Sequence, residues 1–106
     1  MTARLSEAAE RRIHDVIATG PFGRHVGLVV DEVEVDRVVI RMKAAEHVLN
    51  GVGIVHGGAT ATLLDTAATA AAWATPEAKP STRGTTVALT INYIGAGRAG
   101  DMIAEG

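Results

Sequence analysis

Residues 50–65 read Asn50-Gly-Val-Gly-Ile-Val-His56-Gly57-Gly58-Ala-Thr-Ala-Thr-Leu-Leu-Asp65, and they carry the strongest structural signal in the chain. Its two adjacent glycines open a long, alanine-rich apolar run that continues to residue 74. Thr75-Pro76 follows the run, and proline cannot continue a helix. We therefore predict a long central helix over residues 57–74, apolar on nearly every face and so buried on most sides.

The N-terminal part of the chain predicts a second helix. Residues 5–19 carry apolar side chains at helical spacing, Ser6 precedes them as a candidate N-cap, and Gly20-Pro21 is a stop signal. We assign this helix to the segment 1–19. The first twelve residues contain no apolar run of the kind that forms a signal peptide, so we expect none.

Four segments predict strands. Residues 26–35 are rich in β-branched side chains and residues 38–43 alternate with period two, so together they predict an antiparallel hairpin. Residues 86–94 alternate most clearly, and a further strand begins at residue 101. Helix, two strands, buried helix and strands make one α+β domain over residues 1–106. Loops are predicted for residues 20–23, 44–54 and 95–100.

Composition narrows the class of protein. Hydrophobic residues are 47% and charged residues 21% of 106, which is typical of a globular domain. Aromatic residues are only 3%, and so small a core favours oligomerisation. A net charge of −2 gives no attraction to nucleic acid or to an anionic membrane. Cysteine is absent, which excludes disulfides and thiolate nucleophiles and is compatible with the cytoplasmic location that we expect.

Gly57 and Gly58 stand where a helix presents free amides. The first N–H groups of a helix lack internal partners and lie at the positive end of its dipole, so they can polarise a carbonyl and hold an oxyanion. Asp65 lies seven or eight residues further on, about 11 Å along the axis. At that distance, the carboxylate and the glycine amides of one chain cannot both act on the same reacting carbon. We expect a second chain to supply one of the two parts.

Each of these residues also has a structural interpretation. Asp65 can bond Thr62, Thr66 or nearby backbone, although a buried carboxylate without a role costs several kcal/mol. His56 can be a satisfied loop residue, and Asn50 a turn residue. The glycine pair can serve close packing alone.

The same residues resemble a known family. Asn50, a five-residue spacer, His56-Gly57-Gly58 and the Leu-Leu-Asp that ends at Asp65 resemble the signature of hotdog-fold acyl-CoA thioesterases, especially the phenylacetate-degradation type. The resemblance implies an α+β hotdog fold, with a long central helix wrapped by a curved antiparallel sheet. It also implies homodimers or homotetramers with active sites between subunits.

The resemblance assigns roles to six residues. Gly58, with Gly57, would donate amides to the thioester carbonyl, and Asn50 and His56 would hold or polarise the thioester. Asp65 of the partner chain would act as general base or nucleophile, and an ordinary Asp, which titrates near pH 3.9, is ionised at pH 7. The hydroxyl of Thr86 would orient the water. The implied reaction converts an acyl-CoA to a carboxylic acid and free coenzyme A without a metal or another cofactor. A non-catalytic acyl-thioester binder and an inactive fragment are the alternatives, and the acyl group stays open.

Four further patterns bear on function. Family chains are longer, so the resemblance implies a C-terminally truncated domain that lacks two strands between residues 86–94 and the strand begun at residue 101. The glycine pattern of residues 95–100 is a turn, because no helix follows it as a dinucleotide site requires. The four histidines do not have the spacing of metal ligands, and no Glu accompanies them on a helix, so we expect no metal site. Loop side chains that could meet the coenzyme A phosphates are Lys79, Arg83 and Arg98.

Overall fold

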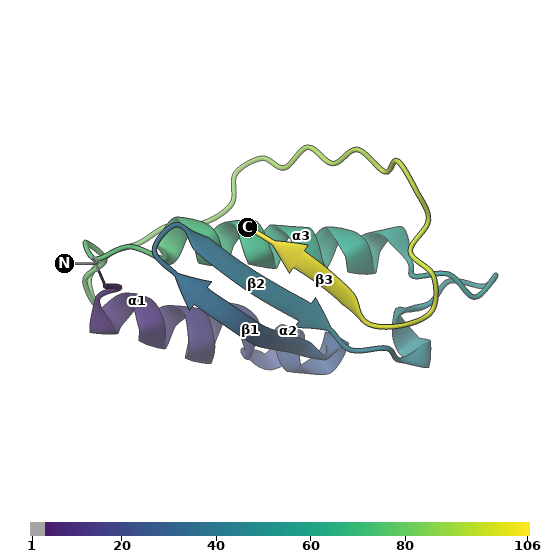
Figure 1. Cartoon of the computed structure of the whole chain (residues 1–106), viewed down its shortest axis with the longest axis horizontal. Coiled ribbons are helices and arrows are strands. Elements are labelled where there is room, and N and C mark those ends of the chain that lie inside the picture. The colour runs from purple at the N-terminus through teal and green to yellow at the C-terminus, as the bar shows by residue number, and fades with distance from the viewer. Residues whose placement is uncertain (1–3) are drawn as a thin grey trace.

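The computed structural model describes residues 4–106, in which an antiparallel three-stranded sheet packs on one long helix (Figure 1). The strands lie in the order β1-β2-β3. The predicted α+β class, with one long helix against an antiparallel sheet, is confirmed. In chain order the elements are α1 (Glu7–Arg11), the π-helix η1 (Arg12–Ala18), α2 (Pro21–Val26), β1 (Leu28–Glu34), β2 (Arg37–Met42), the 3₁₀ turn η2 (Glu46–Val48), α3 (Gly57–Trp73) and β3 (Met102–Glu105).

The predicted hairpin is confirmed as β1 and β2. Leu28 pairs with Met42 and Glu34 with Arg37, with one irregularity in register after Val30. Asp36 turns the chain with a φ of 63°, a left-handed conformation that Asp tolerates better than most residues. Strand β3 pairs antiparallel with β2 and completes the sheet.

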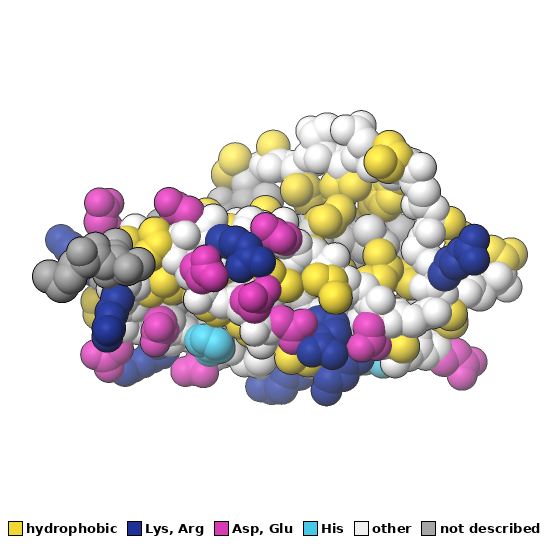
Figure 2. Space-filling model, viewed as in Figure 1, with side chains coloured by type: hydrophobic (Ala, Val, Ile, Leu, Met, Phe, Trp, Pro, Cys, Tyr) yellow, Lys and Arg dark blue, Asp and Glu magenta, His cyan; other side chains and the backbone are white. Residues whose placement is uncertain are grey.

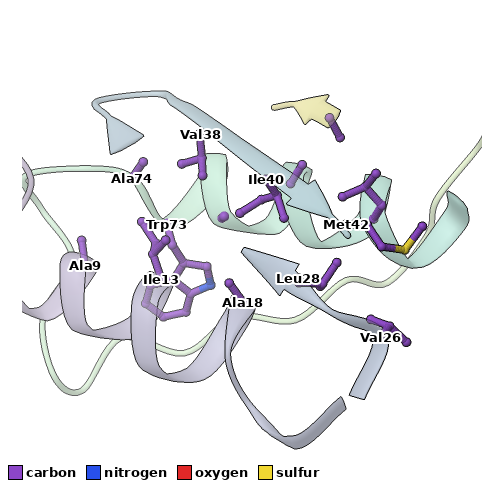
Figure 3. Close-up of a cluster of buried hydrophobic side chains, with 14 of the residues drawn as sticks. Ala9, Ile13, Ala18, Val26, Leu28, Val38, Ile40, Met42, Trp73 and Ala74 are labelled. Carbon is purple, nitrogen blue, oxygen red and sulfur yellow. The ribbon is translucent and has the colours of Figure 1, made fainter. Parts of the chain in front are cut away.

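Helix α3 lies behind the sheet and supplies one wall of the core (Figures 1 and 3). Its buried side chains Leu63, Ala67, Ala70 and Trp73 recur at helical spacing. Small alanines let the sheet approach closely. For example, Gly106 exchanges two backbone hydrogen bonds with Val38. A Cβ atom at residue 106 would clash with the Ala67 carbonyl oxygen of α3, so the sheet is close to the helix at this point. The opposite wall consists of buried side chains of β2 and η1, including Ile13, Val38, Ile40 and Met42.

The N-terminal helix is confirmed over most of its predicted length. Ser6 is the N-cap, because its Oγ accepts the Ala9 N–H at 3.0 Å and also donates to the Ala78 carbonyl at 2.6 Å. From Arg12 the helix widens into the π-helix η1. Residues 1–3 of the predicted segment lie outside the described residues.

The predicted loop at residues 20–23 is wrong, because Pro21 begins a short helix. Proline at the first helical position loses no helical hydrogen bond and has its φ already set for a helix. Gly20 is the N-cap residue, and Gly27, with a φ of 81°, ends α2 in the left-handed conformation. The Gly-Pro pair therefore ends one helix and starts the next.

The strand predicted at residues 86–94 is also wrong: this segment forms no sheet pairing among the described residues. It runs extended in an arch away from β3 (Figure 1). A strand needs a neighbour for its backbone groups, and none lies beside this segment. Its apolar side chains are exposed in consequence, Val87 to 94% and Ile94 to 98%. Figure 2 shows a hollow with apolar side chains under the arch, while charged side chains gather over the sheet.

The predicted loop at residues 44–54 contains one short turn, η2, and two isolated bridges. Leu49 pairs with Val55, and Ile54 pairs with Arg98, which joins the loop to the glycine-rich turn of residues 95–100. Within residues 4–106, no helix has the length and apolar character needed to cross a membrane.

Candidate active site

The start of α3 is capped by the histidine that precedes it. His56 has an extended backbone, and its Nδ1 accepts the Gly58 N–H at 2.8 Å. No hydrogen bond of the described residues uses the Gly57 N–H. The Gly57 carbonyl accepts the Tyr93 hydroxyl at 2.9 Å. The glycine pair thus presents one free amide, at Gly57, and one amide that His56 already occupies.

Asn50 organises the loop in front of this helix. Its side-chain Oδ1 accepts hydrogen bonds from the backbone N–H groups of Val52, at 3.0 Å, and Ile54, at 3.2 Å. The backbone N–H of Asn50 donates to the Ile54 carbonyl. The turn interpretation of Asn50 is therefore correct for its side-chain oxygen. The amide nitrogen of its side chain makes no hydrogen bond to the described part of the chain, so it stays available as a donor.

Asp65 is half-buried on α3 and is held by two threonine hydroxyls. Thr86 Oγ1 donates to Asp65 Oδ1 at 2.7 Å, and Thr69 Oγ1 donates to the same oxygen at 3.3 Å. The two hydroxyls are 3.2 Å apart. Asp65 Oδ2 receives no hydrogen bond from residues 4–106. The carboxylate is thus fixed through one oxygen and free at the other.

These partners of Asp65 were only partly foreseen. The alternative in which Asp65 bonds Thr62 or Thr66 does not hold, since both hydroxyls donate to backbone carbonyls one turn earlier on α3. The hydroxyl of Thr86 donates to Asp65 Oδ1, and its role toward the attacking water stays a prediction. Thr69 was missed, although its spacing of four residues from Asp65 on a helix is a signal that places the two side chains together.

The candidate residues line three separate concave regions of this chain. Asp65 and Thr86, with Thr69, line a cleft of about 340 Å³ under the arch. Asn50 and Gly57 line a second cleft of about 450 Å³. His56 and Gly58 line a third cavity of about 200 Å³. One chain therefore does not bring the carboxylate and the free glycine amide into one cavity.

The charged side chains with shifted pKa values lie outside these regions. Hydrogen bonds to Glu105 and then Glu32 raise the pKa of Arg37, and the two-pronged hydrogen bond to Asp31 raises the pKa of Arg41. Both arginines lie on β2 and are held in ion pairs. In the described part of the chain, no group of three or more metal-binding side chains is close enough to hold a metal ion.

Comparisons with known proteins show the family to which this chain belongs. The pattern of the family described as the thioesterase superfamily matches residues 52–105, just over half of the chain. The chain is 36% identical to acyl-coenzyme A thioesterase 13 from Homo sapiens over 67 residues, which are 63% of this chain and 46% of that protein. The chain thus spans about half the length of the curated relatives that it matches.

Solved structures give the same result. The zebra fish thioesterase superfamily member 2 is 31% identical with a TM-score of 0.72, and the match covers 95% of this chain and 73% of that chain. The E. coli PaaI protein from the phenylacetic acid degradation operon has a TM-score of 0.76 at 24% identity, covering 95% and 70%, and shows the shared fold. Because the family pattern covers the long helix α3 and the strand β3 that packs beside it, this chain belongs to the thioesterase superfamily.

Proposed function

We propose that this protein is an acyl-CoA thioesterase, which hydrolyses an acyl-CoA thioester to a carboxylic acid and free coenzyme A. The observation that carries the proposal is the carboxylate of Asp65, held at Oδ1 by Thr86 and Thr69 and free at Oδ2. Membership of the thioesterase superfamily supports the reaction class. The name of the human relative, acyl-coenzyme A thioesterase 13, supports the acyl-CoA substrate.

In the general-base route, Asp65 Oδ2 takes a proton from water while the water oxygen bonds to the thioester carbon. The electron pair of the carbonyl moves to its oxygen, which the Gly57 N–H and the helix dipole stabilise. The intermediate then collapses, the carbon–sulfur bond breaks, and the thiolate of coenzyme A takes up the proton. In the nucleophilic route, a carboxylate oxygen of Asp65 bonds to the carbonyl carbon, the carbon–sulfur bond breaks, and the thiolate of coenzyme A leaves as a mixed anhydride forms. Water then hydrolyses the anhydride, which releases the carboxylic acid, restores the Asp65 carboxylate and supplies the proton that the thiolate takes up.

The residues around the carbonyl have separate parts in this proposal. Gly57 is the first donor, because its amide is free, and Gly58 joins it when the His56 ring turns away from the Gly58 N–H. Asn50 donates its side-chain amide to the thioester, since its oxygen is occupied in the turn.

A complete site needs two chains. Asp65 and Gly57 line different clefts, and they lie about two helical turns, or about 11 Å, apart along α3. We propose a homodimer or homotetramer in which Asp65 of one copy meets Gly57 of another copy.

A non-catalytic acyl-thioester binder, or an inactive fragment, is the second candidate function. The observation that favours it is the occupied Gly58 amide together with the separation of Asp65 from Gly57 in one chain.

Thiol release from a panel of acyl-CoAs, compared between wild type and Asp65→Asn, separates the two functions. An enzyme that uses Asp65 releases thiol at least about 100-fold faster than the variant. Equal release by both proteins contradicts the role of Asp65. A binder gives a raised Tm with acyl-CoA but no turnover.

A further inference from the structure

The short helix α2 and the first turn of α3 line an open cavity beside the glycine pair. Its volume is about 200 Å³. His56 and Gly58 line it on the α3 side, and no Asp, Glu, Lys or Arg is among the lining residues. Its apolar walls come from α2, from the segment around η2 and from α3, with the side chains of Phe22, Val26, Val48, Leu49 and Ala59.

We infer that this cavity is the acyl pocket and that Phe22 and Ala59 determine which acyl groups it accepts. The inference rests on the proposed function. Gly58 belongs to the glycine pair that would polarise the thioester carbonyl, and it also lines this cavity. The acyl group is bonded directly to that carbonyl carbon, so it enters the space beside Gly58. Because the walls are apolar, an apolar acyl group gains free energy there.

The other arm of the substrate suits the neighbouring cleft of about 450 Å³. The pantetheine arm of coenzyme A contains amide groups, which are costly to bury without hydrogen bonds. That cleft offers the side chains of Asn50, Thr60 and Tyr93 together with the glycine-rich backbone of residues 95–97. Gly57 lines this cleft and Gly58 lines the smaller cavity, so the thioester would lie between them.

The size of the cavity sets the substrate class. An apolar cavity of about 150 Å³ holds one benzene molecule. A cavity of about 200 Å³ therefore holds one six-membered ring, or a linear acyl group of about six carbons. Carbons beyond that length reach solvent past Phe22, which is itself 62% exposed. The expected substrates are short-chain or single-ring acyl-CoAs.

The test measures kcat/KM for acetyl-, butyryl-, hexanoyl-, benzoyl-, decanoyl- and palmitoyl-CoA. Each CH₂ that is fully buried gives about a fourfold gain, and a partly buried CH₂ about twofold. We expect the gain to continue to hexanoyl-CoA and then to stop. A rise at the same slope to palmitoyl-CoA overturns the inference.

Two variants test the walls. Phe22→Ala removes one wall, and Ala59→Leu fills the space. Each should lower kcat/KM for hexanoyl- and benzoyl-CoA by about tenfold while acetyl-CoA changes less than about twofold. Val16→Ala is the matched control, because Val16 is an exposed apolar residue of η1 that does not line the cavity. Unchanged acyl preference in both variants overturns the assignment.

Binding to the Asp65→Asn protein keeps this test independent of catalysis. Calorimetric titration with hexanoyl-CoA and acetyl-CoA should show tighter binding of hexanoyl-CoA, and Ala59→Leu in the same background should abolish the difference. If wild type hydrolyses no acyl-CoA but this difference is present, the proposed hydrolase function fails and the acyl pocket stands. Equal affinity for the two compounds overturns the pocket, whether or not the protein is an enzyme.

Discussion

The hydroxyl of Thr86 donates a hydrogen bond of 2.7 Å to Oδ1 of Asp65, across 21 positions of the chain. This contact joins the extended segment of residues 85–94 to the middle of α3, at a point where the segment has no sheet partner. Thr69, one turn after Asp65, donates to the same oxygen at 3.3 Å, and its hydroxyl oxygen lies 3.2 Å from that of Thr86. The carboxylate is therefore oriented by two hydroxyls, and its second oxygen is left for chemistry.

Thr69→Val should lower kcat by about three- to tenfold, because it removes one long hydrogen bond of 3.3 Å to the Asp65 carboxylate and nearly keeps the shape of the side chain. Thr69→Ser should restore kcat, and KM should stay within about twofold in both variants. Thr66→Val is the control, since Thr66 bonds only a backbone carbonyl on the same helix. Steady-state kinetics with an acyl-CoA decides the matter, and an effect on KM alone contradicts a positioning role for Thr69.

His56→Ala should lower the free energy of unfolding by about 1 kcal/mol, because it removes the N-cap of α3. For a domain of this size that corresponds to a fall in Tm of about 4–8 °C. His56→Asn keeps a capping side chain and should recover most of the loss. Thermal unfolding followed by circular dichroism tests this, with the exposed His14→Ala as control. Equal Tm values for His56→Ala and His56→Asn would rule out the capping role.

Ile40→Ala should destabilise the fold by about 2–5 kcal/mol, because the side chain is fully buried between the sheet and α3. Val52→Ala is the comparison, since Val52 is 81% exposed and should change stability by less than about 0.5 kcal/mol. Denaturant titration measures both. Similar losses at the two positions would contradict the core described here.

Light scattering should give a mass of at least twice 10.9 kDa. The chain exposes 6837 Å², whereas a folded monomer of this mass exposes about 5,600 Å². The excess of about 1,200 Å² is larger than the roughly 800 Å² that each partner buries in a standard interface. A mass of 10.9 kDa at all concentrations would contradict the shared site.

Local patterns predicted most of the helices and the hairpin. The Ser6 cap, the period-two alternation of residues 38–43 and the apolar run from Gly57 each specify structure through near neighbours in sequence. The stop signal at Gly20-Pro21 was ambiguous, because proline ends one helix and favours the first position of the next. Residues 86–94 alternate as a strand does, but a segment becomes part of a sheet only when a neighbouring strand pairs with it. The alternation of one segment does not show whether such a neighbour is present.

The sequence indicated which residues belong to the candidate site, but not all of the contacts that their side chains make. The sequence identified Asp65 and the glycine pair, since helix geometry fixes their spacing. It offered a turn role for Asn50 only as an alternative, and it did not show that His56 occupies the Gly58 amide. Those contacts depend on side-chain rotamers, which a spacing pattern does not specify.

The most direct test of a shared site is complementation between two inactive variants. Asp65→Asn removes the carboxylate. Gly57→Pro removes the free amide at the first position of α3, where proline is well tolerated, and the extended backbone of His56 fits a following proline. In a mixed dimer, one of the two sites would combine an intact Gly57 with an intact Asp65.

We therefore expect thiol release by each variant alone to be near background. Random mixing makes half of the dimers mixed, with one working site each, so co-refolded protein should recover about a quarter of wild-type activity. No recovery, from a mixture in which mixed dimers are demonstrated, would contradict the claim that Asp65 of one copy acts with Gly57 of another.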